Sequence, residues 1–229
     1  MSRAVSQDAP AAVAVPTDAP AAASTAAPAE HRARRDRPRL RLFGQICGAL
    51  LLGAAFLFRD LLEATMLGHM VLQIPIIFFG GLLLFGRAVR NSELFAGYDR
   101  HGLTGLTALL IISSYWMIPR ALEFSLTMPA YELAKFASWA LLGAALPASI
   151  ARANIVIQLF YLGNFCAMTA IAGMLYQDVP EQLCNAYLKD DQALTGAFLI
   201  ILAVAAAVGW CIYRFPALNA PTPPAPVRK

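Results

Sequence analysis

Charged residues are scarce in this chain of 229 residues, and the sequence motifs of common enzyme classes are missing. Asp, Glu, Lys and Arg together make up 14% of the residues, whereas 59% are hydrophobic. The sequence has no GxSxG, no HExxH, no Walker-type loop and no GxGxxG after a strand. Because those motifs carry hydrolase and nucleotide chemistry, their absence argues against both classes. We expect a protein that is not an enzyme.

Paired cysteines and paired histidines are also lacking. The four cysteines form no CxxC pair, and Cys47, Cys166 and Cys211 lie in apolar stretches, where cysteine behaves as a small hydrophobic residue. The CxxCH motif that attaches a c-type haem is absent. His69 is the only histidine in an apolar stretch, so the two axial histidines that a b-type haem needs are not available within the spans.

Long apolar runs dominate what is present. Six runs of roughly 17–25 residues are each long enough to cross a hydrocarbon core about 30 Å thick. They lie near Leu42–Leu62, Met66–Gly86, Leu103–Leu122, Tyr131–Ile150, Ile155–Tyr176 and Leu194–Tyr213. The sequence therefore predicts an all-α fold, a polytopic transmembrane helical bundle of about six spans at residues 41–214. Pro75 and Pro119 lie inside two of the runs and are expected to kink those helices.

The two ends of the chain differ from this apolar region. Residues 1–40 are rich in Ala and Pro and then turn basic, a composition that buries too little apolar surface to fold. We expect a disordered basic tail there, and a second, Pro-rich tail at residues 215–229. The net charge of +4 follows the membrane topology and forms no aromatic-laced basic patch. The expected partner of these charges is the lipid bilayer and not nucleic acid.

Basic residues are distributed asymmetrically about the predicted spans. If the N-terminus is cytoplasmic, four of the 18 Lys and Arg residues fall on the outer side, namely Arg59, Arg120, Lys135 and Lys189. Cytoplasmic segments of membrane proteins carry the excess of Lys and Arg. We therefore predict a multi-pass membrane protein with both termini in the cytoplasm and His69 at the outer face.

A patch of soft metal ligands is expected at that outer face. Met66, His69 and Met70 are three and four residues apart and share one helical face. Asp60 precedes them, and Asp191 opens the sixth span on the same side. Thioether and imidazole groups suit cuprous ion, and a nearby carboxylate can receive the ion or fix the imidazole tautomer. These five residues predict a copper site. In the alternative, His69 hydrogen-bonds a neighbour and the methionines fill gaps.

Two Arg–carboxylate pairs flank this patch at helical spacing. Arg59 with Glu63 and Arg120 with Glu123 are expected to form interfacial ion pairs that cap the bundle.

Four segments resemble the multi-spanning CtaG-type assembly factors of caa-type cytochrome c oxidase. They are RDLLEATMLGHMVLQIPIIFFGG, the YW-x-x-P element at Tyr115–Pro119, NFCAMTAIAGMLY and YLKDDQALTGAFLI. The resemblance covers roughly Arg41–Tyr213 and implies a protein of the bacterial inner membrane that helps to mature a copper-haem oxidase. It also implies oxidase subunits as partners and copper handling at the outer face.

The resemblance assigns roles to individual residues. His69 would be the first histidine of a His-Met-x-x-His element, and Asp191 and Gln192 would be the acidic element of the sixth span. Gln73 stands where the second histidine is expected, and glutamine is a poor ligand for cuprous ion. The family commonly has seven spans, whereas six are predicted here.

Other function classes use the same outer residues without a metal. One is a structural accessory subunit or a small-molecule transporter, although the paired broken helices of many transporters are not evident. Another is an enzyme that acts on a lipid or quinone at the interface, for which the sequence suggests no defined substrate.

Overall fold

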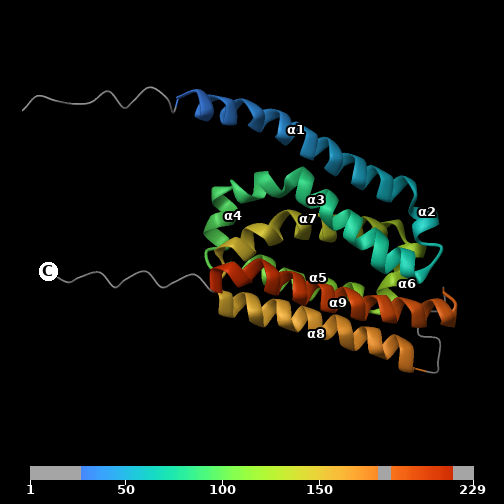
Figure 1. The fold of residues 1–229 in the computed structure, drawn as a ribbon. Coiled ribbons are helices and arrows are strands. Elements are labelled where there is room, and N and C mark those ends of the chain that lie inside the picture. The colour runs from blue at the N-terminus through green and yellow to red at the C-terminus, as the bar shows by residue number, and fades with distance from the viewer. Residues whose placement is uncertain (1–26, 180–186, 219–229) are drawn as a thin grey trace, which may run out of the picture. The chain divides into compact units, whose positions relative to one another are not determined.

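The structure is a computed structural model that describes residues 27–179 and 187–218, and all of its regular elements there are helical. In chain order they are α1 (Ala27–Leu57), α2 (Arg59–Leu62), η1 (Gly68–Gln73), α3 (Ile74–Arg90), α4 (Glu93–Tyr98), α5 (Leu103–Trp116), α6 (Pro119–Thr127), α7 (Pro129–Arg152), α8 (Ile155–Asp178) and α9 (Lys189–Leu218). The predicted all-α fold is confirmed for these residues (Figure 1).

The chain divides into two units, residues 1–40 and residues 41–229. Within the first unit, residues 27–40 are helical, where the sequence predicts a disordered tail. Ala and Arg, which recur in this stretch, are good helix formers. Residues 1–26 and 219–229, which hold the rest of the two predicted tails, lie outside the described residues. Disorder of the N-terminal tail is therefore not confirmed.

Four helices of the second unit are long and apolar enough to cross a membrane. They are Gly68–Arg90, Pro129–Arg152, Ile155–Asp178 and Lys189–Arg214. The pair α5 and α6 passes the same test jointly but is bent by 76°. The apolar part of α1, Arg41–Leu57, is shorter, because the predicted first span is interrupted at Phe58. The described residues thus hold four such helices, or five if the bent pair is one span, against the six predicted.

The helices of the second unit pack in two close pairs joined by α5. α3 packs along α7, α8 packs along α9, and α5 contacts both α7 and α8 (Figure 1). Glycine permits both close approaches. A Cβ added at Gly143 of α7 would collide with the Phe78 carbonyl of α3, and one at Gly196 of α9 would collide with the Gly173 carbonyl of α8. Small residues at such crossings let helix backbones approach each other within a membrane.

The two internal prolines have different consequences. Ile118, which precedes Pro119, is extended, with φ −75° and ψ 122°, because a residue before proline is driven out of the helical region. The chain therefore breaks between α5 and α6 instead of bending gently. Before Pro75 the helix continues, but its preceding turn widens into the π-helical η1. The proline ring crowds the carbonyl of Val71, four residues earlier, and a wider turn relieves that contact.

The second unit has two opposite ends, here named after α4 and α6. The α4 end contains α4, the start of α5 and the end of α7. The α6 end contains α2, η1, α6 and the starts of α7 and α9 (Figure 1).

Candidate functional site

A lysine is fully buried at the α6 end. The Nζ atom of Lys135, which has no exposed surface, lies 2.6 Å from Glu63 Oε1, 2.9 Å from Gln73 Oε1 and 2.9 Å from His69 Nε2. An ammonium group has three N–H donors, so each donor of Lys135 has one acceptor. We call these four side chains the Lys135 cluster. They come from three separate parts of the chain.

The acceptors of the Lys135 cluster are themselves connected. Gln73 Nε2 donates to Glu63 Oε1 at 2.8 Å, so Gln73 serves both the cation and the anion. The Glu63 side chain is 10% exposed and that of Lys135 is 0% exposed. A charge inside a membrane span is costly unless it is paired and hydrogen-bonded. In the cluster the cation, Lys135, is paired with Glu63 and has three hydrogen-bond acceptors.

The hydrogen-bond partners of His69 indicate its tautomer. Its Nε2 lies 2.9 Å from Lys135 Nζ, and its Nδ1 lies 2.9 Å from the hydroxyl of Tyr187. A neutral imidazole has one donor and one acceptor nitrogen, so with Lys135 as an ammonium that donates to Nε2 we assign the proton to Nδ1, which donates to Tyr187. Ser125 Oγ is 3.5 Å from Nε2 and donates to the Leu122 carbonyl at 2.7 Å. Both ring nitrogens therefore have protein partners.

This arrangement bears directly on the predicted copper site. A metal ion needs a free nitrogen lone pair, yet the one lone pair of neutral His69 is taken by a cation, Lys135. Met66 and Met70 are buried, 0% and 4% exposed, and pack with Leu122 and Tyr187 in a hydrophobic cluster. Among the described residues no group of three or more His, Cys, Asp and Glu side chains is placed to hold a metal ion. In the structure both ring nitrogens of His69 therefore have protein partners, and the copper site stays a prediction.

The two predicted carboxylates lie in different surroundings. Asp191 Oδ2 accepts from the backbone N–H of Met66, which begins the helix that leads into η1. The first N–H groups of a helix have no intrahelical partner, and a carboxylate there is favourable. Asp60 is instead 93% exposed and lies 3.5 Å from Arg59. Asp191 is therefore hydrogen-bonded to the backbone N–H of Met66, whereas Asp60 lies at the surface.

Arg59 and Glu63 have other partners than the helical spacing predicts. Arg59 Nη1 lies 2.9 Å from Glu132 Oε2, and Glu63 pairs with Lys135 instead of Arg59. The carboxylate of Glu132 raises the pKa of Arg59 above its ordinary value. Arg120 lies over the ring of Phe124, 5.5 Å from its centroid.

Two clefts open beside the Lys135 cluster. One, of about 150 Å³, is lined by Glu63, Asp60, Glu132 and neighbouring residues of α6 and α7. The other, of about 320 Å³, is lined by Tyr187, Asp191 and neighbouring residues. Because Glu63 lines the first cleft and Tyr187 the second, hydrogen bonds through Lys135 and His69 connect the two clefts.

Sequence reasoning missed most partners of His69. The sequence indicates Lys135 as an outer-side charge and Gln73 as a residue on the helical face of His69, at the position of the expected second histidine, but not the bonds between them. The available signal was Lys135 itself, because a lysine within a predicted span is a functional-site hypothesis by default. Tyr187 carries no such signal, since its contact with His69 joins residues 118 positions apart.

The four segments that carry the family resemblance meet at the α6 end. Tyr176, from the third segment, donates through its hydroxyl to the carbonyl of Met117 in the second at 2.7 Å. Gln192, from the fourth segment, donates to the Tyr176 carbonyl at 3.1 Å. Tyr187, which opens the fourth segment, bonds His69 of the first. These bonds make one site out of four distant stretches of sequence.

The chain was also compared with known proteins. No family model matches it, and neither a curated protein nor a solved structure matches it.

Proposed function

We propose that this chain is a polytopic protein of the bacterial cytoplasmic membrane that assists the assembly of a copper-haem cytochrome c oxidase. The observation that carries the proposal is the meeting, at the α6 end, of the four segments that resemble CtaG-type assembly factors. Separate stretches of sequence that converge on one place are the arrangement expected of a shared functional site. Subunits of the oxidase are the proposed partners, and the chain itself makes or breaks no covalent bond.

The proposed topology has six spans with both termini in the cytoplasm. The four long apolar helices, the α5–α6 pair and Arg41–Leu57 supply the six. A helix of 17 residues is about 26 Å long, and flanking arginines such as Arg41 and Arg59 can extend to the interface to offset the shortfall. The excess of Lys and Arg on the α4 side supports a cytoplasmic α4 end and an outer α6 end.

The Lys135 cluster is the proposed working part. It ties η1, α7 and the segment at Tyr187 together through the side chains of Glu63, His69 and Lys135. The two clefts beside it give a partner subunit access to Glu63 on one side and Tyr187 on the other. Because both ring nitrogens of His69 have protein partners, the proposal contains no copper step, and the copper site stays a prediction from the sequence.

The test is deletion of the gene in its host, followed by measurement of assembled oxidase in isolated membranes. Oxidase is quantified from its reduced-minus-oxidised haem spectrum and from cytochrome c oxidation. We expect deletion to lower both and wild-type protein to restore both. Gly97→Ala is the matched control, because a Cβ at Gly97 meets nothing within 4 Å.

The double variant Glu63→Gln/Lys135→Met tests the role of the buried charges. It removes both charges together, so we expect normal amounts of the chain in the membrane but no restoration of oxidase. Unchanged oxidase in the deletion strain would contradict the proposal and would favour a structural accessory subunit or a small-molecule transporter without a metal.

A further inference from the structure

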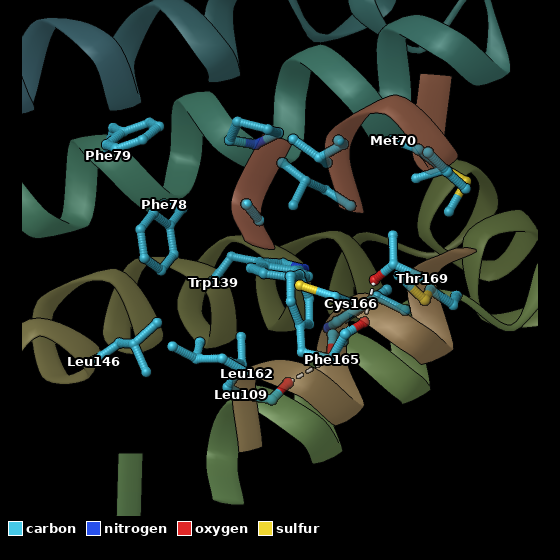
Figure 2. Close-up of a pocket in the computed structure, with 18 residues that line it drawn as sticks. Met70, Phe78, Phe79, Leu109, Trp139, Leu146, Leu162, Phe165, Cys166 and Thr169 are labelled. Carbon is cyan, nitrogen blue, oxygen red and sulfur yellow. Dashed lines mark hydrogen bonds between the residues drawn. The ribbon is translucent and has the colours of Figure 1, made fainter. Parts of the chain in front are cut away.

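An apolar cavity of about 250 Å³ lies among α3, α5, α7, α8 and α9, and none of the four side chains of the Lys135 cluster lines it. Its lining is mostly aliphatic and aromatic, and includes Phe78, Trp116, Trp139, Phe165 and Cys166. Figure 2 shows the ring of Trp139 among the labelled side chains of this lining. The cavity is therefore a separate feature from the site proposed above.

The polar groups in the lining are satisfied within the protein with one exception. Thr169 Oγ1 donates to the Phe165 carbonyl at 2.8 Å, and Ser113 Oγ donates to the Leu109 carbonyl at 2.5 Å. Trp139 is 8% exposed, and its Nε1 is a buried donor without a hydrogen-bond partner. Buried indole N–H groups usually have an acceptor. A ligand in this cavity would supply one.

Trp116, the second tryptophan of the lining, differs from Trp139 because its indole N–H has an acceptor. Its Nε1 donates to Ser138 Oγ at 3.0 Å, so it needs nothing from a ligand. The cavity thus offers apolar and aromatic walls and one hydrogen-bond donor.

The depth of Trp139 limits which molecule can accept that hydrogen bond. Trp139 lies ten residues after Pro129, where α7 begins, and at a rise of 1.5 Å per residue this places it about 15 Å along the helix. With Pro129 taken as the edge of the hydrocarbon core and α7 as perpendicular to the membrane, that depth is near the middle of a core about 30 Å thick. The ester carbonyls of a phospholipid lie at the edge of the core, and only acyl chains without an acceptor reach the middle.

The volume limits the ligand further. An apolar cavity of roughly 150 Å³ holds one benzene molecule, so this cavity has room for one substituted six-membered ring but not for a porphyrin. Leu202 and Ala206 of α9 line it; Leu202 is partly exposed and Ala206 is exposed. A hydrocarbon tail attached to the ring can therefore leave toward the lipid.

We propose that this cavity binds the ring of a lipid-soluble carbonyl compound of the isoprenoid-quinone class, with one ring carbonyl accepting the hydrogen bond of Trp139 Nε1. The aromatic side chains pack against the ring, and its tail leaves past α9. The proposal stands independently of the role in oxidase assembly.

The test compares two probes of the same shape in purified protein reconstituted in lipid nanodiscs. Duroquinone carries two ring carbonyls, and durene is the corresponding tetramethylbenzene without them. Binding of each is measured by titration calorimetry. We expect the wild type to prefer duroquinone by about threefold to tenfold, the range that one hydrogen bond of about 1 kcal/mol supplies.

Three variants decide the outcome. Trp139→Phe keeps a ring but removes the donor, so the preference should disappear while durene binding persists. Trp210→Phe is the matched control, since Trp210 donates to Gln158 and does not line the cavity, and it should keep the preference. Ala206→Phe narrows the opening and should weaken both probes. Equal affinities for the two probes in the wild type, a preference that survives Trp139→Phe, or no binding of either probe would overturn the proposal.

Discussion

Buried charged side chains occur at both ends of the helical unit, but their hydrogen-bond partners differ. At the α4 end, Asp99 is 1% exposed and accepts from the Thr104 backbone N–H at 2.9 Å and from Ser149 Oγ at 2.7 Å. Arg152 lies 3.4 Å from the same carboxylate. Gly102, with φ of +73°, lies in the turn between Asp99 and the start of α5. Asp99 therefore caps the first turn of a helix and joins it to α7.

At the α6 end the side chains of the Lys135 cluster bond one another. Among the described residues, Lys135 donates to three side chains, Glu63, Gln73 and His69, and not to a backbone carbonyl. No turn or helix terminus requires a lysine there. An apolar residue of similar size would avoid the cost of burying the charge.

This comparison separates a structural charge from a candidate functional one. The position of Asp99 follows from the backbone that it caps, whereas the position of Lys135 does not follow from any backbone group. A costly charge without a local structural reason is the one to test for function.

The largest effect is expected from breaking the Lys135 cluster on one side only. Glu63→Gln leaves a buried ammonium without its counter-charge and should lower the free energy of unfolding by about 3–5 kcal/mol. Denaturant titration of the protein in mild detergent measures this. Glu63→Gln/Lys135→Met should recover most of the loss. A loss below about 1 kcal/mol for the single variant would show that the ammonium is not buried as described.

A smaller loss is expected at the α4 end. Asp99→Ala removes the cap of α5 and the partner of Ser149, and should cost about 2 kcal/mol. Oxidase assembly in the complemented deletion strain should stay normal, because this charge serves the backbone. Loss of assembly in a chain present at normal abundance would mean that the two ends do not differ in role.

Tyr187→Phe tests the hydrogen bond between His69 Nδ1 and the Tyr187 hydroxyl. It removes the hydroxyl that accepts from Nδ1–H and should cost about 1 kcal/mol. Nitrogen-15 NMR of labelled histidine should show the neutral Nδ1–H tautomer in the wild type. A predominant Nε2–H tautomer in the wild type would contradict the assigned donation by Lys135.

Asp60→Asn should have the smallest effect. An exposed ion pair contributes little, so the free energy of unfolding should change by less than about 0.5 kcal/mol. Glu132, which pairs with the same arginine at 12% side-chain exposure, provides the comparison, and Glu132→Gln should cost more. Equal effects would indicate that burial does not set the strength of these pairs.

Much of the fold followed from the sequence, because long apolar runs report helices directly. The segments now described as α7, α8 and α9 begin and end within a few residues of their predictions. The break at Pro119 was foreseen only as a kink, since hydropathy does not report the extended conformation of Ile118. The first span was overextended because its apolar run continues past the helix end at Leu57.

The hydrogen-bond partners of His69 could not be predicted from its own helix. Helical spacing brought His69 and its methionines together, but spacing within one helix cannot show what lies across the bundle. Lys135 follows His69 by 66 residues, and its approach depends on the packing of α3 against α7. Because Lys135 and Tyr187 approach His69 from other parts of the chain, both nitrogens of the imidazole that we expected to bind a metal are hydrogen-bonded.

The central claim is that Lys135 and Tyr187 occupy both ring nitrogens of His69. The most direct test is anaerobic loading of the detergent-purified protein with cuprous ion, comparing wild type with His69→Ala by quantitative metal analysis. We expect both proteins to retain the same low copper content, below one ion per chain. Stoichiometric copper in the wild type that is lost in His69→Ala would contradict it and would return the site to the copper role predicted from the sequence.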